Sequence, residues 1–219
     1  MHCEVAAWPA RTSCFWGRTA AVSELLGSSG SAERSSRIAL IGLRGAGKTT
    51  LGRMLADDLG FPYVELSREI EKFAGCSIAE IQALYGVNAY RRYERRALEE
   101  AIQIYPEAVI STPGGLVSDT ATFNELLSHC TSVWLQAEAE DHMTRVIAQG
   151  DMRPMAASRE AMADLKSILD GRAAFYSKAD LHFNTSGRDA AQAREQLLAM
   201  VRNWLSDQGF PDPKNKQHT

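Results

Sequence analysis

Short apolar runs alternate with helical periods along most of the chain, starting at residue 37. Residues 37–41 (RIALI) form an apolar run that ends at a glycine, as expected of a strand buried on both faces. In residues 49–59, leucine and methionine recur at helical spacing until Gly60 ends the pattern. The same alternation predicts further strands at 62–66, 108–111, 132–135 and 180–184. It also predicts helices at 68–74, 88–104, 120–129, 138–149, 158–176 and 188–206.

Five short strands, each followed by a helix, predict a three-layer α/β fold with a five-stranded parallel sheet flanked by helices. Right-handed crossovers would bring the loops after the strands to one edge of that sheet. Two serines precede expected helices. Ser67 is expected to cap helix 68–74, and Ser77 with Glu80 three residues later has the spacing of a capping box.

The two ends of the chain lack this alternation. The N-terminal part mixes aromatic residues with a glycine- and serine-rich run, residues 27–31, of the kind found in flexible linkers. We therefore predict a disordered or remnant extension over residues 1–36, a folded domain over 37–206 and a polar tail over 207–219.

Charge and composition exclude several classes of protein. The 219 residues carry 27 acidic and 24 basic side chains, a net charge of −3, so a basic face that coats nucleic acid is not expected. The sequence has no run of eighteen consecutive apolar residues, which a membrane-spanning helix would need. The four cysteines are widely spaced in the sequence, so we expect them to be free thiols in a reducing compartment. We expect a cytoplasmic monomer with no membrane partner.

The first strand leads directly into residues 42–50 (GLRGAGKTT), which contain the phosphate-loop spacing G-x-x-x-x-G-K-[ST]. Glycines let such a loop turn its backbone N–H groups toward phosphate oxygens, and the following helix N-terminus favours the anion. Lys48 would face the β- and γ-phosphates, and the Thr49 hydroxyl would bind the Mg²⁺ that bridges them. We predict an ATP site with Mg²⁺. Its residues are Gly42, Gly45, Ala46, Gly47, Lys48, Thr49 and Thr50.

Further motifs resemble those of shikimate kinases, in the same order and spacing over residues 37–206. They are GxSIxEI (75–81), YRxxE (90–94), STPGG (111–115), RP (153–154) and RxxxY (172–176). The resemblance implies a P-loop kinase fold with a mobile lid. It also implies transfer of the ATP γ-phosphate to the 3-hydroxyl of shikimate or a related small acid.

The resemblance assigns roles by position. Arg91, Arg172 and the Gly114-Gly115 turn would hold the anionic substrate, and a planar guanidinium can bind a carboxylate by two parallel hydrogen bonds. Arg153 would act with Lys48 in catalysis from a lid around residues 150–155, although this segment could instead be an ordinary loop between helices. Arg188 would lie on the adenine side.

Two positions depart from the family. Shikimate kinases carry Asp-x-Asp after the second strand, whereas this chain has Glu65-Leu66-Ser67. Glu65 still offers a carboxylate on the metal side, but Ser67 replaces the carboxylate that orients the attacking hydroxyl and can accept its proton. Loss of a positioned base typically costs about 10²–10⁴ in rate, so impaired turnover is expected. Pro113 replaces the first glycine of a three-glycine turn and stiffens it.

Local segments also resemble the kinase-like domain of benzoyl-CoA-responsive transcription regulators. These segments are 65–72, 89–96, 112–115 and 149–155. In that family the domain senses an effector behind a helix-turn-helix, but residues 1–36 are too few for such a domain, so no DNA binding is expected of this chain. Two functions stay open. The first is phosphorylation of shikimate or a related small acid. The second is a non-catalytic or weakly catalytic domain, from a transcription regulator that lacks its DNA-binding part, which senses benzoyl-CoA or another aromatic acyl-CoA with bound nucleotide.

Overall fold

The computed structural model describes residues 36–148 and 159–210. Nearly all of the predicted extension, the predicted lid with Arg153, and residues 211–219 of the predicted tail lie outside this part of the chain. Within it, no helix has both the length and the apolar character that crossing a membrane requires.

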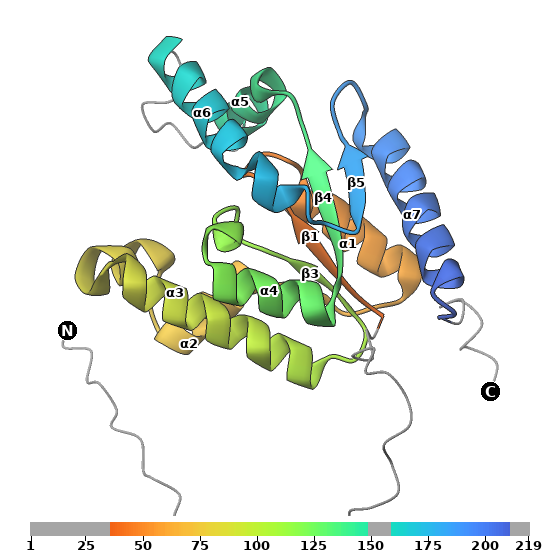
Figure 1. Cartoon of the computed structure of the whole chain (residues 1–219), viewed down its shortest axis with the longest axis horizontal. Coiled ribbons are helices and arrows are strands. Elements are labelled where there is room, and N and C mark those ends of the chain that lie inside the picture. The colour runs from red at the N-terminus through yellow and green to blue at the C-terminus, as the bar shows by residue number, and fades with distance from the viewer. Residues whose placement is uncertain (1–35, 149–158, 211–219) are drawn as a thin grey trace, which may run out of the picture. The chain divides into compact units, whose positions relative to one another are not determined.

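Five parallel strands form one sheet in the order β2-β3-β1-β4-β5 (Figure 1). Leu40 pairs with both Ser111 and Val133, and Ser111 also pairs with Glu65, so the strands that contain Leu40, Ser111 and Glu65 end close together at one edge of the sheet. The predicted parallel sheet is confirmed. The strands are β1 (Arg37–Ile41), β2 (Tyr63–Glu65), β3 (Ala108–Ser111), β4 (Thr131–Gln136) and β5 (Leu181–Asn184).

The helices lie on both faces of this sheet (Figure 1). They are α1 (Lys48–Leu59), α2 (Leu66–Ala74), α3 (Ile78–Ile104), α4 (Thr120–His129), α5 (Ala139–Ala148), α6 (Arg159–Tyr176) and α7 (Ala190–Asp207), with a 3-10 turn, η1, at Leu116–Ser118.

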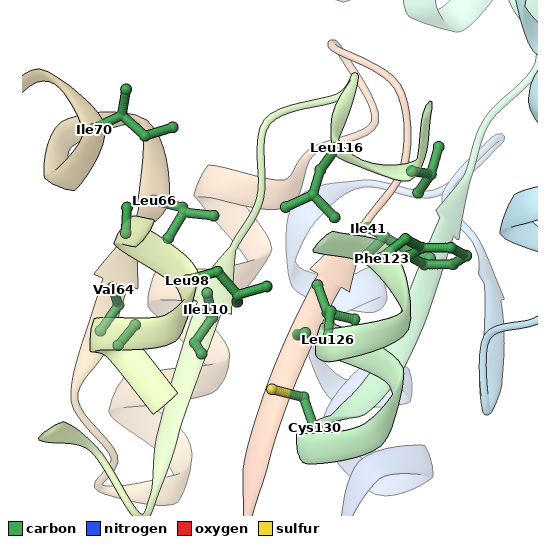
Figure 2. Close-up of a cluster of buried hydrophobic side chains, with 14 of the residues drawn as sticks. Ile41, Val64, Leu66, Ile70, Leu98, Ile110, Leu116, Phe123, Leu126 and Cys130 are labelled. Carbon is green, nitrogen blue, oxygen red and sulfur yellow. The ribbon is translucent and has the colours of Figure 1, made fainter. Parts of the chain in front are cut away.

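Alternate residues of β1 enter two separate apolar cores because successive side chains of a strand point to opposite faces. Ile38 and Leu40 belong to a core formed with α1 and α7. Ala39 and Ile41 belong to a second core formed with α2, α3 and α4. Figure 2 shows side chains of this second core, among them Ile41, Val64, Leu66, Leu98, Ile110, Phe123 and Leu126. The predicted three layers are confirmed.

The starts of α2 and α3 are among those that differ from the sequence-based expectation. The α2 helix begins at Leu66, so Ser67 is its second residue and not its N-cap; the first turn, with its fully buried Leu66 side chain, starts two residues earlier than predicted. The α3 helix begins at Ile78 and continues to Ile104 across a kink at Gly86, so the predicted helix 88–104 is only its second part. The capping box of Ser77 is confirmed.

Candidate active site

The loop between β1 and α1 has a backbone conformation that its glycines make possible. Gly42 has a φ of +139° and Gly45 a φ of +78°, in the region where residues with a Cβ are strained. A Cβ on Gly42 would lie 2.5 Å from the Leu135 carbonyl oxygen, and one on Gly45 would lie 2.8 Å from the His142 carbonyl oxygen. Both positions therefore require glycine for space as well as for conformation.

Lys48 lies over this loop. Its ammonium donates hydrogen bonds to the carbonyl oxygens of Gly42, at 2.8 Å, and Leu43, at 2.9 Å. Burial lowers the pKa of Lys48 to about 8, the Arg44 charge adds to this shift, and Glu65 opposes it. The loop thus holds a buried, partly desolvated positive charge beside the N-terminus of α1, where an anion is favoured.

Thr49 and Glu65 place a hydroxyl and a carboxylate next to the loop. The Thr49 hydroxyl donates to Glu65 Oε1 at 3.1 Å, and Glu65 also pairs with Arg53 at 3.4 Å and Arg68 at 3.6 Å. No three His, Cys, Asp or Glu side chains of the described ranges cluster closely enough to hold a metal ion alone. A hydroxyl and a carboxylate suit Mg²⁺, which takes few protein ligands and completes its shell with phosphate oxygens and water.

A cavity of about 540 Å³ extends from the loop to the guanidinium groups of Arg91 and Arg172. It therefore has a loop end, at Lys48 and Thr49, and a guanidinium end, at Arg91 and Arg172. The other predicted residues that line it are Gly45, Gly47, Thr50, Glu65, Ser67, Gly114 and Gly115. The sequence motifs had not singled out Arg44 and Gln82, which line it too.

Arg91 is held at the guanidinium end by a buried carboxylate. It pairs with Glu94, which is 0% exposed and also accepts a hydrogen bond from the Tyr90 hydroxyl at 2.9 Å. Burial raises the pKa of the Glu94 carboxyl, and the Arg91 guanidinium opposes that shift. A Cβ on Gly115 would lie 3.3 Å from Arg91 Nη2, so the small residue there lets the guanidinium lie against the turn.

Arg172 is fixed by the same turn. The Gly114 carbonyl accepts a hydrogen bond from Arg172 at 3.0 Å and another from the Tyr176 hydroxyl at 2.9 Å. Tyr176 in turn stacks on Trp134 of β4, with 5.4 Å between ring centroids. Two guanidinium groups from α3 and α6 thus line one cavity with defined positions, and paired guanidinium groups are suited to binding a small carboxylate.

A second cavity of about 310 Å³ lies on the other side of the loop, toward α7. The predicted residues Ala46, Thr50 and Arg188 line it, and Arg188 is held by the Asn184 carbonyl at 2.6 Å. Arg145 also lines it and donates to the Thr185 hydroxyl at 2.8 Å; sequence reasoning missed this residue, because no motif marks it.

The fold therefore gathers every predicted site residue that the structure describes around two adjoining cavities. Gly42 is not in either lining, and its carbonyl oxygen holds Lys48. Arg153, expected to act with Lys48, lies outside the described residues.

Comparison with known proteins agrees with this geometry. The family model described as "Shikimate kinase" matches residues 44–202. The chain is 36% identical over 164 residues to a shikimate kinase of Zymomonas mobilis, covering 75% of this chain and 90% of that protein. It is 32% identical over 178 residues to a shikimate kinase of Synechococcus sp., covering 81% of this chain and 90% of that protein.

Solved structures with the same arrangement include the shikimate kinase of Acinetobacter baumannii in complex with shikimate. It has a TM-score of 0.68 at 27% identity and covers 80% of this chain and 96% of its own. The shikimate kinase of Bacteroides thetaiotaomicron also has a TM-score of 0.68, at 28% identity, and covers 75% of this chain and 97% of its own. The loop, the cavities and the sequence agreement all lead to one assignment: this chain belongs to the shikimate kinase family.

Proposed function

We propose that this protein transfers the γ-phosphate of ATP to the 3-hydroxyl of shikimate, with Mg²⁺ bound beside the nucleotide. The observation that carries the proposal is the continuity of the 540 Å³ cavity, which joins Lys48 and Thr49 to Arg91 and Arg172. A phosphate donor at one end and an anionic alcohol at the other would share this space.

At the loop end, the backbone N–H groups and Lys48 would hold the β- and γ-phosphates. Thr49 and Glu65 would hold Mg²⁺, which neutralises phosphate charge when bound. Phosphoryl transfer depends mainly on positioning and on positive charge around the migrating group. Lys48, already drawn toward the loop by two carbonyl oxygens, supplies such a charge without having to move far.

At the guanidinium end, Arg91 and Arg172 would hold the shikimate carboxylate. Arg91 is fixed by Glu94 and Arg172 by the Gly114 carbonyl, so little side-chain entropy is lost when the substrate binds. The substrate's hydroxyl groups would then face Ser67 and the loop end. This would place the reacting oxygen between the two halves of the site.

Ser67 would make the transfer slow. A serine hydroxyl is not ionised near neutral pH and cannot accept the proton of the attacking alcohol, as the family's aspartate can. We propose that the protein is a weak shikimate kinase for this reason. We also propose that it acts as a monomer in the cytoplasm.

Ser67 is also the observation that favours a second candidate function. A pocket without its base could bind an aromatic acyl-CoA as an effector, with nucleotide binding retained and turnover lost. In that case the guanidinium end would hold a carbonyl or phosphate group of the effector.

A coupled ADP-release assay with shikimate, set beside calorimetry with benzoyl-CoA, separates the two functions. We expect shikimate-dependent ADP release below the usual kinase range of about 1–100 s⁻¹. Release that shikimate does not stimulate, together with saturable benzoyl-CoA binding, would replace the kinase proposal with the sensor. Arg172→Met is the matched control, because it should remove the shikimate response and leave ATP binding unchanged.

A further inference from the structure

The α5 helix supports the outer side of the loop between β1 and α1. Leu43 of the loop belongs to a small apolar core that includes Ala139 of α5. Two residues further along, a Cβ on Gly45 would lie 2.8 Å from the carbonyl oxygen of His142 on α5. The helix therefore contacts the loop on both sides of Arg44.

Between these two contacts, the His142 side chain bonds the loop backbone. Its Nδ1 lies 2.9 Å from the Arg44 carbonyl oxygen, and the residue is only 1% exposed. A carbonyl oxygen can only accept a hydrogen bond, so Nδ1 carries a proton and donates the bond. The imidazole is thus a buried donor aimed at one peptide group of the loop.

The surroundings of His142 keep its ring neutral near pH 7. Burial lowers the pKa of His142, and the bond to the Arg44 carbonyl opposes this shift. The Lys48 and Arg145 charges lower the pKa further, whereas the Asp141 charge opposes them. A neutral imidazole carries one proton, and the bond places that proton on Nδ1.

The direction of the Arg44 carbonyl fixes the direction of the next N–H group. In a planar trans peptide bond, the C=O and the N–H point in opposite directions. The Arg44 carbonyl faces His142, so the N–H of Gly45 points away from His142. Gly45 lines the cavity that contains Lys48, where the phosphates would lie.

We propose that His142 is a positioning residue of the loop between β1 and α1: its Nδ1–H holds the Arg44 carbonyl so that the Gly45 N–H faces a bound phosphate. The inference rests on the ATP-binding part of the proposed function. Lys48 holds the two preceding carbonyl oxygens, so side chains hold three consecutive carbonyl oxygens of the loop. Donors fixed in this way need little reorganisation when the anion binds.

Two substitutions separate the hydrogen bond from the packing of the ring. His142→Leu keeps an apolar side chain and removes the donor, whereas His142→Asn places an amide N–H close to the position of Nδ1. His129→Leu is the matched control. The Nδ1 of His129 lies 3.0 Å from the Glu125 carbonyl oxygen within α4, and no residue of α4 lines either cavity.

ADP affinity is measured by calorimetry, and adenosine affinity by competition with ADP, because adenosine has no phosphate. We expect His142→Leu to weaken ADP binding about tenfold, since it leaves a buried carbonyl unpaired and its peptide group free to turn. His142→Asn should recover most of this loss. Adenosine affinity should be the same in all variants, and His129→Leu should bind ADP as wild type does.

NMR of the histidine ring nitrogens gives a readout that does not depend on how well a variant folds. In the wild-type protein at about pH 8, His142 should be the neutral tautomer with its proton on Nδ1. A ring protonated on Nε2 instead could not donate to the Arg44 carbonyl and would overturn the inference.

The binding outcomes are equally distinct. Wild-type ADP affinity in His142→Leu would overturn the inference while the proposed function stood. Equal losses in His142→Leu and His142→Asn would trace the effect to ring packing, and a matching loss of adenosine affinity would place it away from the phosphates; either result overturns the inference. If the wild-type protein did not bind ADP, the nucleotide part of the proposed function would itself fail.

Discussion

Replacing Ser67 by aspartate should convert the protein into a faster shikimate kinase. Ser67 lines the cavity between the loop end and the guanidinium end, and it is the second residue of α2. An aspartate there would reach the space where the attacking hydroxyl would lie. Arg91 and Arg172 line the same cavity and would keep the new carboxylate ionised and able to accept a proton.

The size of the gain follows from the position. A positioned general base is worth about 10²–10⁴ in rate, or about 3–5 kcal/mol of barrier. The first turn of a helix and two nearby guanidinium groups lower the basicity of a carboxylate, so the gain should lie near the lower end, about 10² in kcat. An aspartate in the first turn of α2 should also raise the free energy of unfolding by about 0.3–1 kcal/mol, because a negative charge is favoured at the N-terminus of a helix.

The assay is initial-rate ADP release with saturating ATP and varied shikimate, with urea unfolding of the same samples. Ser67→Asn is the matched control, since it has the size of aspartate without the charge. An equal gain in Ser67→Asn would show that pocket shape, not the base, limits the wild type. No gain in Ser67→Asp, with ADP affinity unchanged, would refute the reasoning and point to a remodelled acceptor pocket.

Two further substitutions test the nucleotide half, and a third tests how burial of His142 affects stability. Lys48→Ala should weaken ADP binding about 10–100-fold in calorimetry without unfolding the protein, because charged hydrogen bonds are worth about 1.5–3 kcal/mol; normal affinity would contradict the loop assignment. Gly45→Ala should weaken ADP binding as well, because a residue with a Cβ pays about 1–2 kcal/mol to adopt the left-handed backbone conformation of Gly45. ADP binding equal to that of the wild type would show that the loop relaxes to accept alanine. Burial lowers the pKa of His142 below its usual value of 6.5, so the unfolded chain binds more protons than the folded one as pH falls below 6.5. The free energy of unfolding should therefore decrease in that range, by at most about 1.4 kcal/mol per pH unit for this residue. Urea unfolding at several pH values should therefore show a flatter profile for His142→Gln, and an unchanged slope would rule out this residue as its source.

The strands and the phosphate loop could be predicted from sequence because their signals are local. The apolar run of β1 and the glycine-lysine spacing after it lie within a few residues of each other, and the fold follows them closely. The start of α2 could not be predicted in this way, because a buried Leu66 outweighed the capping preference of Ser67.

Other site residues became visible only in three dimensions. His142 bonds the Arg44 carbonyl at 2.9 Å across 98 residues of sequence, and Arg145 reaches the Gly45 carbonyl at 3.5 Å across 100. Both lie on α5, whose pattern predicts a helix and nothing more. Contacts of this range depend on how α5 packs against the loop, and a single sequence carries no signal for that.

The apolar layers on the two sides of the sheet have a consequence for how this protein could change over generations. The apolar layer packed against α1 and α7 supports the loop between β1 and α1. The apolar layer packed against α2, α3 and α4 supports Arg91 and its neighbours. The sheet separates the two layers, so a side chain replaced in one layer does not pack directly against the side chains of the other. A change on the acceptor side, such as one at position 67, can therefore be accepted without repacking the side of the sheet that supports the phosphate loop.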